Sequence, residues 1–244
     1  MLNTYLSPLW ISLRTVFVSM AITFALGIAA ARWMTRYSSK FGKLIDGLFI
    51  LPLLLPPTVV GLGLLVIFGT HGPIGRFLSL FGTTIVFSWP ATVISASVMS
   101  FPLMYMASRG AFEQVDKRLE DAARTLKASE WRLFWSVTFP LAWPGVAAGT
   151  VLALARIMGE FGATLMLAGN IPGKTSTIPV AIYFAIQDGN MSQAWMLVAI
   201  VLAISFVSLA VLAYFRRAGP AARLRASEAP WEPVDSRFSL LEKR

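Results

Sequence analysis

Residues 113–140 have the sequence EQVDKRLEDAARTLKASEWRLFWSVTFP, a charged stretch set between long apolar runs. Its leucines and alanines recur at three- and four-residue spacing, which predicts an amphipathic helix. These apolar positions are Leu119, Ala122, Ala123, Leu126 and Leu133. Charged side chains fill the remaining faces of the helix. The pattern fits either a solvated helix on a membrane surface or a docking element for a partner protein.

The chain around this stretch is too apolar for a soluble domain. Hydrophobic residues make up 56% of its 244 residues, and its mean hydropathy is +0.67. We therefore expect an all-α integral membrane protein. The net charge of +9 comes from basic residues beside apolar runs, not from a basic groove, so no nucleic-acid partner is expected. The chain has no cysteine and one histidine, His71, so no metal site is expected.

Five apolar runs are long enough to cross a membrane, since a spanning helix needs roughly 20 residues. They cover residues 9–34, 47–69, 83–108, 139–168 and 195–215. Residues 178–186 are too few to span and predict a re-entrant or surface helix. Residues 216–244 are rich in charge, proline and alanine, which is typical of a disordered tail.

Charge predicts the orientation of these five spans. With residues 113–140 in the cytoplasm, 17 of the 21 Lys and Arg residues lie on the cytoplasmic side. The reverse topology would place them outside, against the positive-inside bias. We therefore expect residues 1–8 to be an extracytoplasmic N-terminus and residues 216–244 to be cytoplasmic.

The second run contains LPLLLPPTVVG, residues 51–61. Each proline removes a backbone donor and crowds the preceding turn, so Pro56 and Pro57 predict a kinked or broken helix. Such a break is either a simple structural kink or a place where backbone lines a cavity within the membrane.

Arg156 and Glu160 are charges inside the fourth run. Their four-residue spacing predicts that they share one helical face. A charge in the middle of a span is costly, so each should face a partner or a wet cavity. For Arg156 we favour an ion pair that fixes helix packing. For Glu160, with glycines on both sides, we favour a place beside a pathway or a subunit interface.

Glycines in the same run and after it predict close packing and turns. Gly145 and Gly149 form a small-xxx-small pair, which lets another helix approach closely. Residues 168–179, AGNIPGKTSTIP, are similar to a phosphate-binding loop but lack its glycine spacing, so we interpret them as a turn-rich connection.

The charged stretch resembles the cytoplasmic loop of the permease subunits of type I ABC importers, whose pattern is E-A-A-x-x-x-G-x(9)-I-x-L-P. The matching positions are Asp121, Ala122, Ala123, Val137, Phe139 and Pro140. Lys127 stands where the family has glycine. Within that family, residues 51–61, 98–104, 119–126 and 159–183 are similar to the molybdate transporter permeases. The resemblance covers roughly residues 9–215.

The resemblance implies a permease domain over residues 9–215 with the type I ABC importer fold and a cytoplasmic coupling loop at residues 109–138. It implies a homodimer in the inner membrane with two ABC ATPase subunits, which bind ATP and Mg, and an extracytoplasmic molybdate-binding protein. The chain itself would be a transport subunit without cofactor or enzyme site. The residues expected to couple to the ATPase are Leu119, Asp121, Ala122, Ala123, Arg124, Leu126 and Lys127.

Molybdate is a dianion, yet the predicted spans contain no cluster of basic residues that could bind it. This favours a pathway lined by hydroxyls, backbone donors and broken-helix ends. We expect Pro56, Pro57 and Thr58, together with Glu160 and Thr164, to lie near the pathway or its gate.

Other substrates and classes stay open. The same machine could carry sulfate or tungstate, since these dianions differ only modestly in size. An intramembrane enzyme is disfavoured because Glu160 is the only carboxylate in the proposed spans. A passive channel or scaffold fits the spans but gives no reason for the amphipathic helix.

Lys127 carries a separate prediction. Glycine in the family pattern would let one short helix end and Ser129 cap the next. We expect this break to survive, with Lys127 in a left-handed conformation facing solvent or an acidic partner surface.

Overall fold

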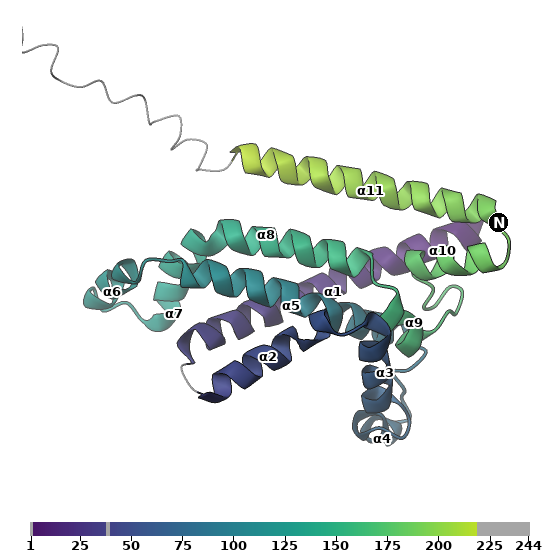
Figure 1. The fold of residues 1–244 in the computed structure, drawn as a ribbon, viewed down its shortest axis with the longest axis horizontal. Coiled ribbons are helices and arrows are strands. Elements are labelled where there is room, and N and C mark those ends of the chain that lie inside the picture. Colours follow the sequence, from purple (N-terminus) through teal and green to yellow (C-terminus); the bar gives the residue numbers. More distant parts are fainter. Residues whose placement is uncertain (1, 38–39, 219–244) are drawn as a thin grey trace, which may run out of the picture. The chain divides into compact units, whose positions relative to one another are not determined.

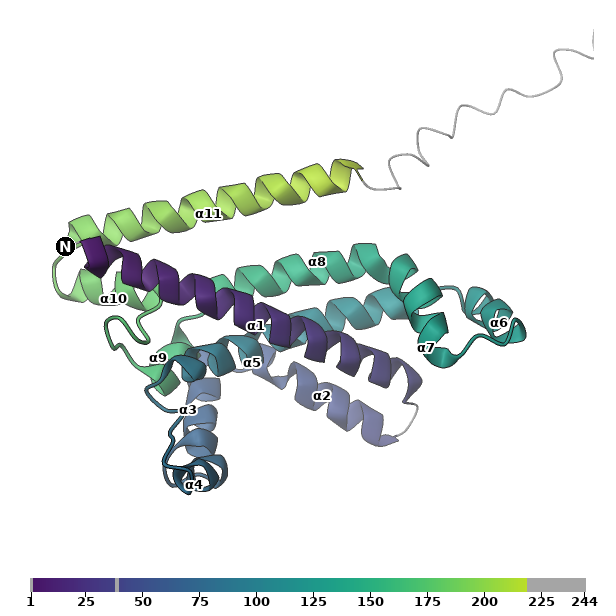
Figure 2. The same cartoon turned by 180° about the vertical axis from the view of Figure 1, so that it is seen from behind.

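The fold is built entirely from helices over residues 2–37 and 40–218, which are the residues that the computed structural model describes. Three long helices, α1 (Leu2–Arg36), α5 (Trp89–Glu113) and α8 (Phe139–Met158), pack side by side (Figures 1 and 2). We call them the three-helix bundle. The prediction of an all-α protein is confirmed.

Small residues bring α8 close to α5. A Cβ atom added to Gly145 would lie 2.6 Å from the Cβ of Ala111, and one added to Gly149 would lie 2.6 Å from the Cβ of Ala107. Both distances are far below van der Waals contact, so only glycine fits at either position. The close approach predicted from the glycine spacing is confirmed.

Hydroxyl groups join α1 to α5 in the buried interior. Thr15 and Thr92 share a hydrogen bond of 3.0 Å, and Thr23 and Ser100 share one of 2.9 Å. Between apolar helices, such hydrogen bonds and close packing hold the pair together where a hydrophobic driving force is weak.

The second apolar run is broken as predicted. It forms α2 (Lys40–Leu54) and α3 (Pro57–Phe68), and the chain bends by 115° between the two helices. Pro56 precedes the first turn of α3 and Pro57 begins it, where a missing backbone N–H costs nothing. Together with the short α4 (Pro73–Ser79), α3 stands across the direction of the long helices (Figure 1).

The sequence predicts one helix through Ala168 for the fourth apolar run, and this prediction is wrong. The run forms two helices. Helix α8 ends at Met158, and α9 (Gly162–Ala168) begins after a break. Gly159 closes α8 with a backbone hydrogen bond of 3.2 Å to Ala155. At the other end, the helical path reaches back through a π-helical segment, η1 (Phe134–Thr138), to α7 (Glu130–Leu133).

The remaining helices are α6 (Lys117–Thr125), α10 (Ile178–Gln187) and α11 (Met191–Ala218). Positive φ angles at Gly169 and Gly173 confirm the turn-rich connection before α10. Over the described residues, three helical segments are long and apolar enough to cross a membrane, or four if the bent pair is one span. The five-span topology therefore stays a prediction.

The helices at both ends of the chain extend into the segments predicted to be termini. Helix α1 begins at Leu2, within the predicted N-terminal segment 1–8, and α11 continues to Ala218, past the predicted start of the tail. The rest of the tail, residues 219–244, lies outside the described residues.

Candidate functional site

The charged stretch folds into a helical unit at the end of the three-helix bundle remote from α9 and α10 (Figures 1 and 2). We call it the α6–α7 module and define it as residues 116–138, which hold α6, a turn, α7 and η1. The side chain of Asp116 caps α6 by accepting a hydrogen bond of 2.9 Å from the N–H of Arg118. No residue of α6 is buried.

The turn between α6 and α7 is centred on Lys127, which has a left-handed φ of 59°. The N–H of Ala128 donates to the carbonyl of Ala123 at 3.1 Å, and the N–H of Lys127 donates to that of Arg124 at 2.9 Å. This pair of bonds is the Schellman motif that ends many helices, usually at glycine. Ser129 then caps α7. The predicted end and restart are confirmed, with Lys127 exposed.

An apolar face of the module is open to its surroundings. Leu126 is 84% exposed and Leu119 is 48% exposed. Ala122 beside them is exposed and Ala123 is partly buried. Exposed leucines next to alanines leave space for a partner surface to approach the backbone closely. The predicted docking face is thus accessible, although its partner stays a prediction.

Arg124 is held by carboxylates of the module itself. It pairs with Asp121 at 2.8 Å, with Glu130 at 2.9 Å and with Glu120 at 3.5 Å. These carboxylates, Glu130 above all, raise the pKa of the Arg124 guanidinium above its usual value. We expected Asp121 and Arg124 at the partner interface. Asp121 pairs with Arg124 inside α6, and Arg124 also binds α6 to α7 through Glu130.

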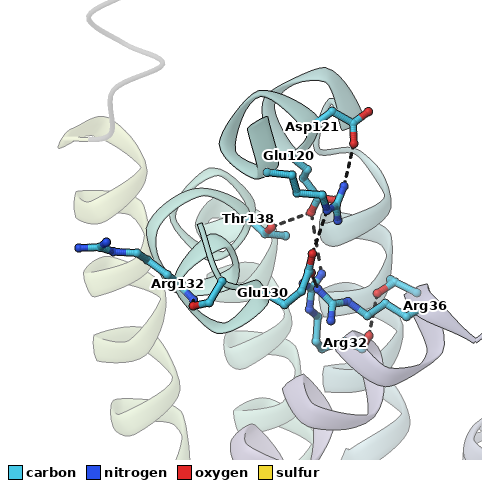
Figure 3. Close-up of polar contacts among 10 residues, drawn as sticks. Arg32, Arg36, Glu120, Asp121, Glu130, Arg132 and Thr138 are labelled. Atoms are coloured by element: carbon cyan, nitrogen blue, oxygen red, sulfur yellow. Dashed lines mark hydrogen bonds and ion pairs between the residues drawn. The ribbon is translucent and has the colours of Figure 1, made fainter. Parts of the chain in front are cut away.

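Two arginines at the end of α1 face two of these carboxylates, Glu120 and Glu130 (Figure 3). Arg36 forms an ion pair with Glu130, and Arg32 lies 3.8 Å from Glu130 and 3.9 Å from Glu120. Glu120 also accepts a hydrogen bond of 2.7 Å from Thr138. The sequence indicates only that the two arginines belong to the positive charge on the cytoplasmic side. Their four-residue spacing at a span end was a usable signal, but nothing local indicated which carboxylates they meet.

A second charged cluster, which sequence reasoning also missed, joins α2 to α5. Tyr105 donates a hydrogen bond of 2.6 Å to Asp46, and Arg109 forms an ion pair of 2.5 Å with the same carboxylate. Arg109 also pairs with Glu113 at 2.7 Å. The first half of the broken helix is therefore tied to the bundle by a charged side chain.

The candidate pathway residues meet where the N-termini of α3 and α9 pack together. A Cβ atom on Gly162 would lie 2.9 Å from the Cβ of Pro57, and one on Gly61 would lie 2.8 Å from the Cα of Ala163. Pro56, Pro57 and Thr58 are exposed, whereas Thr164 is buried. The structure brings the two groups of residues into neighbouring helices, and their role in transport stays a prediction.

Glu160 lies beyond the end of α8 and not on it, so the prediction that it shares one helical face with Arg156 is wrong. The break at Gly159 lets its side chain reach both ways. One oxygen, Oε2, pairs with Arg156 Nη1 at 2.7 Å, and the other, Oε1, accepts a hydrogen bond of 2.8 Å from the N–H of Ala163. The predicted Arg156–Glu160 ion pair is confirmed. The Glu160 side chain is buried, with 3% exposure, and it joins α8 to the start of α9.

The acidic residues of these clusters do not form a metal site. No group of three or more His, Cys, Asp or Glu side chains that could hold a metal ion occurs among the described residues.

Comparison with known proteins places the chain among transport components. A family model described as binding-protein-dependent transport system inner membrane component matches residues 23–218. The molybdenum transport system permease protein ModB of Escherichia coli (strain K12) is 48% identical over 203 residues, which cover 82% of this chain and 89% of the relative. The protein named "Probable sulfate transport system permease protein cysT" of Chlorokybus atmophyticus is 31% identical over 199 residues, covering 82% and 70%.

Solved structures confirm the fold. A chain of the MetNI methionine ABC transporter in inward facing conformations matches with a TM-score of 0.68. The match covers 89% of this chain and 97% of that one at 16% identity, so it supports the architecture alone. The expected type I ABC importer permease fold is thereby confirmed.

Proposed function

The chain belongs to the family of binding-protein-dependent transport system inner membrane components and is an ABC importer permease, and from this premise we propose that its importer carries molybdate. The observation that carries the choice of substrate is 48% identity over most of the chain to a molybdenum permease, against 31% to the protein named for sulfate. Sulfate and tungstate are the alternative cargoes, because they share the charge and shape of molybdate.

The proposed complex contains two copies of this chain, two cytoplasmic ABC ATPase subunits and an extracytoplasmic molybdate-binding protein. The ATPase subunits bind ATP and Mg, and this chain binds no cofactor. Its orientation follows the positive-inside bias, which puts the α6–α7 module and the C-terminus in the cytoplasm and the N-terminus outside.

In this proposal the α6–α7 module couples the permease to the ATPase. Leu119, Ala122, Ala123 and Leu126 form the docking face. The exposure of Leu119, Ala122 and Leu126 supports this, and no residue of α6 is buried. The Lys127 turn sets the direction in which α7 leaves this face. Closure of the ATPase pair on ATP moves the module, and the permease alternates between inward- and outward-facing states.

The pathway proposal concerns the contact between α3 and α9. Exposed Pro56, Pro57 and Thr58 border it from α3, and the α9 side holds Glu160 and Thr164. Because Glu160 is already paired with Arg156, its charge would not repel an anion as strongly as a free carboxylate. We place the gate at this contact.

Transport by the reconstituted complex tests the substrate. Permease, ATPase and binding protein in liposomes should take up radiolabelled molybdate only with ATP, and excess sulfate should compete weakly. Uptake of labelled sulfate in preference to molybdate would overturn the choice of cargo. Molybdate flux that is independent of ATP would instead favour a passive channel.

The docking face has its own test. Leu126→Asp places a charge at the most exposed leucine of the face and should reduce co-purification of the ATPase by about tenfold or more, as expected for a central interface residue. Leu126→Met keeps an apolar side chain and is the matched control. Equal recovery of the ATPase with both variants would contradict the proposed docking face.

A further inference from the structure

Helix α1 and the α6–α7 module are joined by charged side chains that the docking face does not use. The link contains Arg32 and Arg36 from α1 and Glu120 and Glu130 from the module (Figure 3). We call these four residues the α1 latch. All four side chains converge on one space between the end of α1 and the module, whereas Arg132 points away from it (Figure 3).

Arg32 is the more enclosed of the two arginines of the latch. Its side chain is 17% exposed, and its guanidinium lies 4.8 Å from the centre of the Phe134 ring in η1. It lies 3.8 to 3.9 Å from the two carboxylates, at the limit of an ion pair, and its Nη2 atom has no hydrogen-bond partner among the described residues. At these distances the Arg32 guanidinium can move toward one carboxylate while it stays near the other.

Glu120 and Glu130 extend the latch through the whole module. Glu120 comes from α6 and is also bonded to Thr138 at the end of η1. Glu130 comes from α7 and is also bonded to Arg124 of α6. A displacement of either short helix therefore changes the charges around Arg32.

We propose that Arg32, assisted by Arg36, is the positioning residue that makes α1 follow the α6–α7 module during transport. The inference rests on the proposed function, because it takes the module to be the element that the ATPase moves. Since α1 is fixed to α5 by buried hydroxyl pairs, a pull on its end reaches the interior of the bundle. Without the latch, the module would dock and move while α1 lagged behind.

Amide hydrogen exchange on the full-length permease tests the latch directly. In the double variant Arg32→Gln/Arg36→Gln, residues 117–133 should exchange about fivefold faster, which corresponds to losing a few weak ion pairs. Arg132→Gln removes the same type of charge from α7 outside the latch and should leave exchange unchanged. Wild-type exchange rates in the double variant, or an equal increase in Arg132→Gln, would overturn the proposal.

Coupling in the reconstituted complex tests the functional consequence. The double variant should still bind the ATPase and hydrolyse ATP, but the molybdate transported per ATP should fall by about fivefold. Lys43→Gln, an exposed cation of α2 without an ion pair among the described residues, should keep the wild-type ratio. A wild-type ratio in the double variant would overturn the role of α1.

A covalent replacement of the latch separates positioning from general stability. The chain has no cysteine, so Arg36→Cys/Glu130→Cys can be joined selectively by a short bifunctional reagent. Cross-linking should restore the transport ratio that the unlinked variant has lost, and no recovery on cross-linking would contradict the proposal. If the wild-type complex carries no molybdate, the proposed function fails, and the exchange measurement still decides whether the latch holds the module.

Discussion

The three-helix bundle packs through small residues and neutral hydroxyls, whereas the α6–α7 module is held by ion pairs between long, partly exposed side chains. Gly149 admits Ala107 at a distance that no larger residue tolerates, and Thr23 and Ser100 share a buried hydrogen bond. In the module, Arg124 reaches three carboxylates while itself remaining exposed.

The difference follows from the surroundings of each region. Helices in an apolar environment gain little from burying apolar surface against each other, so they depend on close packing and directional hydrogen bonds. Such contacts are lost when a helix shifts by a fraction of an ångström. Ion pairs near water are individually weak but tolerate several geometries. The comparison teaches that this chain couples a rigid region to an adjustable one, and substitutions should cost stability mainly in the first.

The largest expected effect is at Glu160, where a buried charge serves two helices. Glu160→Ala removes both the ion pair with Arg156 and the hydrogen bond from the N–H of Ala163 in the first turn of α9. It should lower the free energy of unfolding by about 2–3 kcal/mol, since Arg156 is only partly buried. Chemical denaturation in detergent measures this change. Glu160→Gln can still accept the bond from Ala163 and should lose less.

Glu113→Ala is the matched control for Glu160→Ala. Glu113 also pairs with an arginine four residues away, but its side chain is about half exposed, so its loss should cost less than about 1 kcal/mol. Equal costs at the two positions would mean that burial does not separate these ion pairs.

Packing within the bundle gives the next effect. Gly149→Ala forces a Cβ atom to within 2.6 Å of that of Ala107 and should cost about 1–3 kcal/mol of unfolding free energy, because neither helix backbone can move freely. Gly110→Ala on α5 has nothing within 4 Å of its added Cβ and should be neutral or stabilising. Thermal unfolding of the two purified variants compares them, and similar melting temperatures would refute the close α5–α8 contact.

The smallest effect is expected in the module, at Lys127. Lys127→Gly removes the strain of a left-handed lysine and should raise the unfolding free energy by up to about 1 kcal/mol while leaving transport intact. Ala128→Gly, at the next position, relieves no such strain and should not stabilise. Denaturation and uptake assays on both variants check this, and a loss of transport in Lys127→Gly would show that the lysine side chain itself is needed.

Local patterns in the sequence predicted most elements and some of their contacts. Apolar runs predicted the long helices, Pro56 and Pro57 predicted the break, and the spacing of Gly145 and Gly149 predicted the close helix pair. The turn at Lys127 was predicted because this residue stands at the glycine position of the family pattern. Ser129 two residues later is suited to cap the next helix. Each of these features depends on residues close together in the chain.

The missed features depend on distant residues or on a choice between equal local options. Nothing near Arg32 indicates that it meets Glu120, because the pairing depends on how α1 and the module pack. Gly159 is tolerated inside an apolar helix and also ends one, so the sequence alone did not place the end of α8. An apolar helix that continued through Gly159 would place Glu160 on the same face as Arg156, whereas α8 ends before Glu160.

The π-helical segment Phe134–Thr138, the last part of the module, affects the rotation of α6 and α7 about the helix axis relative to α8. A π turn holds one residue more than an α turn, and each residue of an α-helix advances the facing direction by about 100°. Deleting one residue here would preserve the amphipathic pattern of α6 and the apolar length of α8. It would nevertheless turn the docking leucines by roughly a quarter of a circle relative to the bundle. The segment thus acts as an angular spacer whose length, more than its composition, decides where the module points.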